Sequence, residues 1–125
     1  PERNPLLQLA ALRGRLMEIL AMRQHPDHRK LGDQAFLCGI MSLMPAALGL
    51  PIEEILSQIA VTPDLQLALT EQSGTLGALL TLIERLDAED WDACDRLLAD
   101  SPELSRETLT AALTEGLAWI HADRD

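Results

Sequence analysis

Apolar residues recur at helical spacing along almost the whole chain, and this period is the strongest constraint on the fold. The clearest stripe lies near the start, where apolar residues follow one another mostly three or four positions apart. Its members are Leu6, Leu9, Leu12, Leu16, Ile19 and Leu20. Aromatic residues, which strands favour, make up only 2% of the sequence. The apolar content comes instead from Leu, Ala, Ile and Met, and this predicts an all-α protein.

The chain has 125 residues, which is enough for one domain with a buried core. We therefore predict a single helical domain over residues 1–125, folded as a bundle of about six to seven helices. The sequence starts at Pro1 without a Met. We take that start as an arbitrary boundary and expect the chain to be the C-terminal part of a larger protein.

Caps and prolines predict where the first helices begin and end. Asn4 suits an N-cap, and Pro5 suits the first helical position that follows it. Residues 24–28 form the next connection, because Pro26 cannot continue the helix. Arg13 lies off the apolar stripe and is predicted to point away from the core. A second helix is then expected from about residue 31 to residue 48.

This second helix is apolar on nearly every face, which predicts that it is buried all round. Gly39 lies in its middle, where the missing side chain lets a neighbouring backbone approach. Pro45 should kink the helix near Met41. Gly49 stands where a C-terminal cap belongs.

Shorter helices are predicted after this central one. Their starts are expected at Pro51, at Thr62-Pro63-Asp64, near Thr75, near Ala88 and after Ser105, which caps the last helix. The first of them has Ile52, Ile55, Leu56 and Ile59 as its apolar set. In the last helix we expect an inward face of Leu109, Ala112, Leu113, Gly116, Leu117 and Ile120.

The charge is strongly acidic and unevenly distributed. A net charge of −10 disfavours binding to phosphate backbones, so no nucleic-acid partner is predicted. Six of the ten basic residues nevertheless lie in the first thirty: Arg3, Arg13, Arg15, Arg23, Arg29 and Lys30. This asymmetry could steer one end toward an acidic partner, or it could be a solvated face. We favour the solvated face.

Cysteine usage and hydropathy bear on the compartment. Cys38 and Cys94 are isolated and sit in apolar helical patterns, as free buried thiols do. A reducing, cytoplasmic location fits them, and no signal peptide is recognisable. Residues 34–52 carry no charge, and this segment is nearly long enough to span a bilayer. We interpret them as a buried helix with its exit loop and predict no membrane insertion.

Several His and acidic residues are candidate metal ligands. His25 and His28 could reach one metal with Asp27, but we expect all three to be exposed loop residues. His121 suits the end of the last helix. The run Asp87, Glu89, Asp90, Asp92 and Asp95 lacks the glycine of a calcium loop, and we expect a solvated helix start.

Other candidate residues also have structural explanations. Glu53 and Glu54 favour the first turn of a helix. Ser73-Gly74-Thr75-Leu76-Gly77 could receive a phosphate at a helix N-terminus, but the neighbouring sequence holds no Lys or Arg, so we favour a tight turn. Trp91 and Trp119 are predicted to anchor helices in the core. No catalytic, cofactor-binding or metal-binding residue is predicted, and the chain is not expected to be an enzyme.

The order of these motifs resembles the HDOD domain, the HD-related output domain. The motifs are NPLLQLAALRGRLMEILA at 4–21, AFLCGIMSLM at 35–44, LGLPIEEIL at 48–56, GTLGALL at 74–80 and Asp90-Trp91. The sequence is most similar to bacterial proteins that place an EAL domain ahead of the HDOD domain, the group also called modified HD-GYP. It departs from the family at Pro45, where a polar residue is common.

The resemblance implies an HD-like helical fold without the metal ligands of HD-type phosphohydrolases. It also implies a regulatory role in cyclic di-GMP signalling, through contacts with an EAL domain of the same full-length protein or with a second copy. Two alternatives remain open. One is an HD-type metal-dependent phosphohydrolase with a non-standard site, and the other is a stand-alone helical adaptor.

Overall fold

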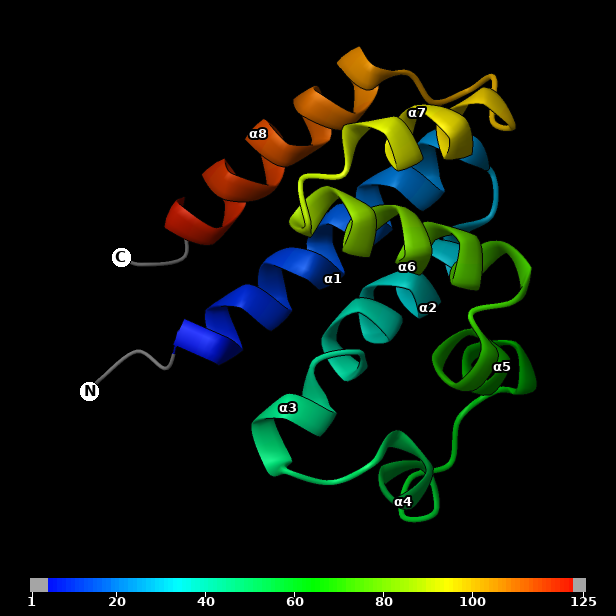
Figure 1. Cartoon of the computed structure of the whole chain (residues 1–125), viewed down its shortest axis with the longest axis vertical. Coiled ribbons are helices and arrows are strands. Elements are labelled where there is room, and N and C mark those ends of the chain that lie inside the picture. Colours follow the sequence, from blue (N-terminus) through cyan, green and yellow to red (C-terminus); the bar gives the residue numbers. More distant parts are fainter. Residues whose placement is uncertain (1–4, 123–125) are drawn as a thin grey trace.

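The computed structural model describes residues 5–122, and these form eight α-helices without a strand. The predicted all-α bundle is therefore confirmed (Figure 1). The helices are α1 (Pro5–Gln24), α2 (Arg29–Met41), α3 (Met44–Leu48), α4 (Ile52–Leu56), α5 (Pro63–Glu71), α6 (Gly74–Asp87), α7 (Trp91–Ala99) and α8 (Arg106–Ala122). The count exceeds the expected six to seven because the predicted second helix is divided in two.

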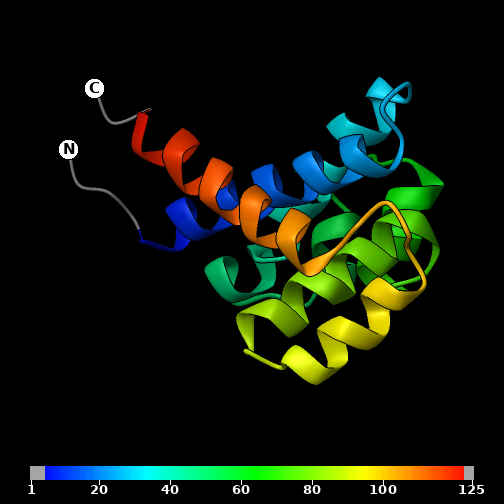
Figure 2. The ribbon, with the colours of Figure 1, turned by 90° about the horizontal axis from the view of Figure 1, so that it is seen from above.

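Helix α1 is central to the arrangement. Seen from above, α8 crosses α1, while α6 and α7 lie together to one side (Figure 2). Helix α1 contacts both α8 and α6. Helix α2 packs along α1 and also meets α5 and α6. The core lies between α1, α2, α5 and α6, and buried residues of α7 and α8 extend it. Its most deeply buried large side chains include Met17, Leu20, Cys38, Leu65, Leu80 and Ile83.

Two glycines bring α1 and α2 into direct backbone contact. A Cβ atom on Gly39 would lie 2.5 Å from the Cα atom of Gly14. A Cβ atom on Gly14 would lie 2.7 Å from the carbonyl oxygen of Phe36. Both distances are shorter than real side chains allow, so only glycine fits either position. The close approach predicted at Gly39 is confirmed.

The central apolar segment breaks where a kink was predicted. Helix α2 ends at Met41 and α3 begins at Met44, with Pro45 in its first turn. The Ser42 hydroxyl donates back to the carbonyl oxygen of Gly39 at 2.7 Å, which satisfies one acceptor of the terminating turn. Gly49 then ends α3 in the left-handed conformation, at φ 68°, as its position predicted.

Helical periodicity misplaced several apolar side chains. The second helix is not buried all round, since Leu37 is 39% exposed and Leu48 is 57% exposed. Ile59 lies beyond the end of α4 and is 48% exposed. Leu9 on α1 and Leu117 on α8 are also exposed, although the stripes predicted them to face inward. Periodicity identifies an apolar face, but it cannot tell whether another element covers that face.

Most predicted caps are confirmed by hydrogen bonds. The Thr62 hydroxyl accepts from the backbone N–H of Leu65 at 3.2 Å and starts α5. Ser105 accepts from the N–H of Thr108 at 3.0 Å and starts α8. Each bond satisfies one first-turn donor. The proposed cap at Asn4 lies outside the described residues.

One described segment is long and apolar enough to cross a membrane by length and composition alone. It is Arg29–Leu48, and the break between α2 and α3 falls inside it. A core helix of a soluble protein passes the same test. The predicted cytoplasmic location and lack of membrane insertion therefore stay predictions.

The glycine contact can be tested by adding a single methyl group. Gly39→Ala should lower the free energy of unfolding by about 1–3 kcal/mol, because the new Cβ atom would overlap the α1 backbone. This sign opposes the intrinsic helix preference, under which Ala is favoured over Gly by about 1 kcal/mol. Urea denaturation followed by circular dichroism would measure the change. Ala78→Leu, at an exposed position of α6, is the control and should have little effect. A Gly39→Ala variant as stable as the parent would show that the helices do not meet there.

Candidate functional site

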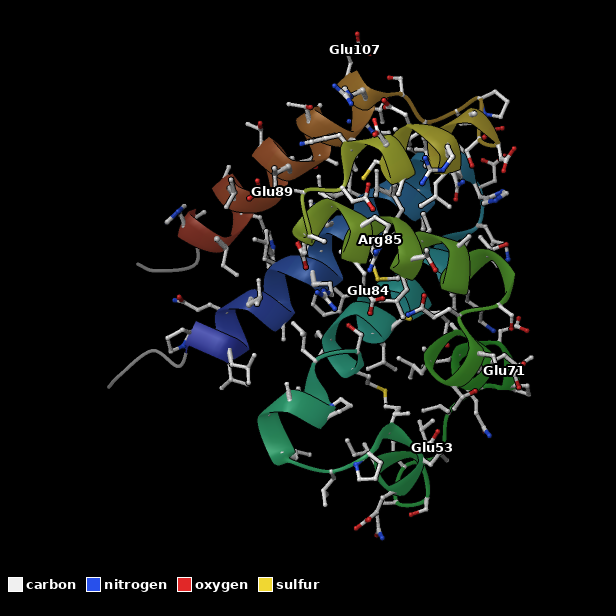
Figure 3. The ribbon with its side chains drawn as sticks, in the orientation of Figure 1. Glu53, Glu71, Glu84, Arg85, Glu89 and Glu107 are labelled. Carbon is white, nitrogen blue, oxygen red and sulfur yellow. The ribbon has the colours of Figure 1, made fainter. Side chains whose placement is uncertain are left out.

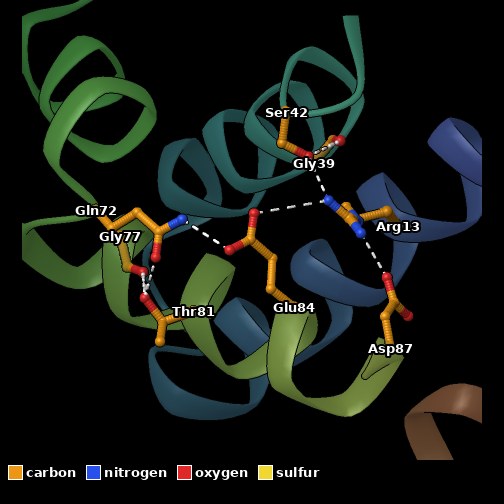
Figure 4. Close-up of polar contacts among 8 residues, drawn as sticks. All are labelled: Arg13, Gly39, Ser42, Gln72, Gly77, Thr81, Glu84 and Asp87. Atoms are coloured by element: carbon orange, nitrogen blue, oxygen red, sulfur yellow. Dashed lines mark hydrogen bonds and ion pairs between the residues drawn. The ribbon is translucent and has the colours of Figure 1, made fainter. Parts of the chain in front are cut away.

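The described residues contain one buried charged side chain, that of Arg13 on α1. The sequence predicted that it points away from the core, and this is wrong. Its Nη2 atom donates to the Asp87 carboxylate at 2.5 Å, and its Nη1 atom donates to the Ser42 hydroxyl at 3.0 Å. Glu84 lies 4.0 Å from Nη1 (Figure 4). Arg13 is buried because the ends of α2 and α6 supply acceptors that sequence spacing does not reveal.

The same polar contacts continue along α6 to the end of α5. The Gln72 side-chain amide donates to Glu84 at 2.8 Å and accepts from the Thr81 hydroxyl at 2.6 Å (Figure 4). Gln72 caps α5 in the left-handed conformation, at φ 52°, which is uncommon outside glycine. A polar chain therefore runs from the α5 cap, across α6, to Arg13. We call it the Arg13 network.

The Arg13 network is suited to holding helices rather than to chemistry. A guanidinium serves as a hydrogen-bond donor and does not exchange protons at ordinary pH. Asp87 and Glu84 are already engaged by Arg13 and Gln72. The network joins the ends of α2 and α6 to the middle of α1.

The two loop histidines do not converge on a metal site. His28 caps α2, with its Nδ1 atom accepting from the backbone N–H of Leu31 at 3.2 Å. His25, Asp27 and His28 are all exposed, as predicted. Within residues 5–122, no group of three or more His, Cys, Asp or Glu side chains could hold a metal ion. His121 is exposed in the last turn of α8.

A surface cleft lies where the starts of α2, α5 and α6 meet. It encloses about 550 Å³ and is lined by His25, His28 and Lys30 together with Ser73 and Gly74. The prediction that no Lys or Arg lies near Ser73-Gly74 is wrong, because Lys30 on α2 lines the same cleft. Asp64 also lines the cleft and offsets part of the positive charge.

The tight turn predicted at the start of α6 is present. Gly74 has a φ of 77°, in the left-handed region that favours glycine. A Cβ atom on Gly77 would overlap the carbonyl carbon of Gln72, so α6 packs directly on the end of α5. The predicted first-turn position of Glu53 and Glu54 in α4 is likewise confirmed.

Both cysteines are free and buried, as their apolar neighbours predicted. Burial raises the pKa of the Cys38 thiol from 9.0 to about 12, and the nearby Glu84 carboxylate adds to the rise. Burial also raises the pKa of Cys94, with smaller contributions from Asp90 and Asp95. A nucleophilic cysteine needs a lowered pKa, so neither thiol is activated for catalysis.

The acidic run at 87–95 is divided between structural roles and the surface. Asp87 binds Arg13, and Asp90 caps α7 by accepting from the N–H of Ala93 at 3.1 Å. Glu89 has a left-handed φ of 56° in the corner between α6 and α7 (labelled in Figure 3). Asp92 lies exposed in the first turn of α7.

The two tryptophans have different environments. Trp119 is half-buried and meets Phe36 edge to face at 6.2 Å, which attaches α8 to α2 as predicted for a core anchor. Trp91 is 39% exposed, so its predicted core role is wrong. The Arg106 guanidinium lies 4.7 Å from its ring centre and covers one part of the indole.

The basic residues near the start are only partly solvated. Arg15 pairs with Glu18 at 3.0 Å and with Glu115 at 3.5 Å. Arg23 also reaches Glu115, at 3.8 Å. The prediction that these basic residues form a solvated face is therefore wrong for Arg13. Helix α8 supplies part of the negative charge that pairs with the others. Arg3 lies outside the described residues.

Two curated relatives match most of the chain. The first, cyclic di-GMP phosphodiesterase CdgJ of Vibrio cholerae serotype O1, is 33% identical over 111 residues, which cover 85% of this chain and 25% of CdgJ. The second, the uncharacterized protein YuxH of Bacillus subtilis, is 24% identical over 119 residues, covering 95% of this chain and 28% of YuxH. The chain thus spans about a quarter of the length of these relatives.

Family models and solved structures give no further match to the chain. No family model matches it, so membership of the HDOD family stays a prediction. No solved structure matches it either.

The role of the Arg13 network can be tested at Asp87. Asp87→Asn should lower the free energy of unfolding by about 1–2 kcal/mol, because it leaves a buried guanidinium without its closest carboxylate. The loss should be smaller than that of a fully buried pair, since the Asp87 side chain is 43% exposed. Adding Arg13→Met should recover part of the loss by removing the buried charge.

The matched control is the exposed pair of Asp95 and Arg106. Asp95→Asn should change the free energy of unfolding by less than about 0.5 kcal/mol. Urea denaturation of all four proteins measures these differences. Equal effects of Asp87→Asn and Asp95→Asn would show that Arg13 does not depend on its buried pairing.

The cysteine environments predict protection from thiol reagents. In the folded protein at pH 7–8, neither Cys38 nor Cys94 should react with Ellman's reagent on the scale of minutes, because both are buried and protonated. Both should react promptly in denaturant. Absorbance of the released thiol anion gives the count. A thiol that reacts at once in the folded protein would contradict the assigned burial.

Proposed function

We propose that this chain is a non-catalytic regulatory domain of a protein that acts in cyclic di-GMP signalling. The observation that carries the proposal is the match to CdgJ, which is named as a cyclic di-GMP phosphodiesterase and is 33% identical over most of this chain. The match involves only about a quarter of CdgJ. We infer that the chain corresponds to a module of such a protein rather than to the whole.

The polar chemistry of the described residues supports a module without its own reaction. Hydrolysis of a phosphodiester by an HD-type enzyme requires several His and Asp ligands that hold metal ions and activate water. In the described part of the chain, the one buried charged side chain is that of Arg13, whose two Nη atoms are engaged by Ser42 and Asp87. The activated thiol that a cysteine-based mechanism needs is also lacking, because burial raises the pKa of both cysteines.

The resemblance to EAL–HDOD proteins suggests the partner. We expect the domain to act by contacting an EAL domain of the same full-length protein or a second copy of this chain. Regulation of this kind needs differential contact with two states of the partner and does not need a reaction in the regulator.

The adaptor alternative has support from one specific feature. Leu9, Trp91 and Leu117 are each about 40% exposed, and Leu9 lines one hollow with Trp91 and another with Leu117. Large exposed apolar patches mark sites that contact other proteins, membranes or ligands. Both an adaptor and a regulatory domain need a surface that contacts a partner. They differ in whether that partner is an enzyme.

Assay of the purified chain separates the proposed function from the HD-type alternative. Incubated with cyclic di-GMP or with nucleotides, in the presence of Mn²⁺ or Mg²⁺, the chain should release no product above the buffer rate. Chromatography of the reaction mixtures measures this, with an established phosphodiesterase as the positive control. Turnover that disappears in His25→Ala or His28→Ala would overturn the proposal. Elemental analysis after metal loading gives an independent readout, since a displaced metal site would retain Mn²⁺.

A further inference from the structure

The cleft where the starts of α2, α5 and α6 meet has the size of a small-molecule site. It encloses about 550 Å³, within the range of about 300–1,000 Å³ that is typical of ligand pockets. Its apolar lining comes from Leu31, Leu67 and Leu76, one leucine from each of the three helices. Polar side chains of the same helices complete the lining. We call it the three-helix cleft.

Two opposite charges line the three-helix cleft without pairing. Lys30 lies at the start of α2 and Asp64 in the first turn of α5, and both side chains are exposed. Within residues 5–122, neither side chain makes an ion pair or a hydrogen bond, with the other or with any third residue. A ligand that engages both would therefore carry an anion on one side and a hydrogen-bond donor on the other.

The start of α6 adds to the anion-binding side of the cleft. Its N-cap, Ser73, makes no side-chain capping bond, so the first N–H groups of this 14-residue helix receive no acceptor from their own cap. The approach to them is open, since a Cβ atom on the exposed Gly74 would meet no other atom within 4 Å. His25 also lines the cleft, and its imidazole, which has no hydrogen-bond partner in the described chain, offers a further donor.

Contacts between the helices hold the walls of the cleft in place. The Thr62 hydroxyl donates to the Gln34 side chain at 2.9 Å, which joins the start of α5 to α2. On the other wall, the Gln72 side chain binds Thr81 and Glu84 and so fixes the turn between α5 and α6. Binding a ligand would then need little ordering of the protein, and this favours affinity.

We propose that the three-helix cleft binds a nucleotide whose base carries an amino group. The phosphate would lie between Lys30 and the start of α6, and the amino group would donate to the Asp64 carboxylate. The leucines would contact the base and the sugar. An amino acid also joins an anion to a donor, but it would fill only a small part of this volume. The inference rests on the proposed function and deepens it, because a bound nucleotide would be the input of the regulatory domain.

Calorimetric titration of the whole chain tests the proposal with defined probes. GMP and AMP carry an amino group on the base, UMP carries none, and ribose 5-phosphate has no base. GMP, AMP or both should bind about tenfold more tightly than UMP and ribose 5-phosphate, as expected for a hydrogen bond to a charged group. The tighter of the two identifies the base. The amide resonance of Gly74 should shift on binding, which places the ligand at the start of α6.

Variants of the two charged residues separate recognition from general attraction. Lys30→Gln should weaken every phosphate ligand several-fold. Arg29→Gln is the matched control, because Arg29 is the neighbouring exposed cation and does not line the cleft, so binding should change by less than about twofold.

Asp64→Ala should act in opposite directions on the two kinds of ligand. It should weaken the amino-bearing nucleotide several-fold by removing the acceptor of its amino group. It should tighten ribose 5-phosphate slightly, because a negative charge leaves the cleft. Asp33→Ala removes an exposed acid of α2 that does not line the cleft, and it should leave the nucleotide's affinity nearly unchanged.

Three outcomes would overturn the proposal. One is no binding of GMP or AMP at millimolar concentration, and another is an equal loss in Lys30→Gln and Arg29→Gln. The last is equal affinity for all four probes with no response to Asp64→Ala, which would leave a site for phosphate alone. These outcomes do not bear on the hydrolysis assay. Turnover in that assay would overturn the proposed function and leave the binding result standing.

Discussion

The backbone contact between Gly14 and Gly39 determines the positions of most other features of the domain. Without side chains at the crossing, α1 and α2 approach to a distance that no other residue type would allow. Arg13 directly precedes Gly14, and Ser42 lies one helical turn after Gly39. The close crossing therefore brings the Arg13 guanidinium within 3.0 Å of the Ser42 hydroxyl. A wider separation would leave a buried cation short of acceptors, at a cost of several kcal/mol.

The break between α2 and α3 completes this arrangement. Helix α2 stops at Met41, so the Ser42 hydroxyl both closes the last turn onto Gly39 and accepts from Arg13. Pro45 lies in the first turn of α3, where its missing N–H leaves no acceptor unpaired. The residue at which the sequence departs from the HDOD pattern is thus accommodated without loss of a helical hydrogen bond.

The sequence predicted the helices well because local signals determine them. The caps at Thr62 and Ser105, and the glycine that ends α3, each act within one turn of the chain. Packing between distant segments carries no such signal. Periodicity therefore could not show that α8 leaves Leu9 exposed, or that Lys30 lies beside the start of α6.

Arg13 shows the same limit for the candidate site. Its neighbours in sequence place it off the apolar stripe, and only the fold brings Asp87 within 2.5 Å of it. Oppositely charged residues far apart in a sequence are so common that such a pair does not predict a contact. The exposed loop positions of His25 and His28 could be predicted from the sequence directly, because the break at Pro26 is itself a local signal.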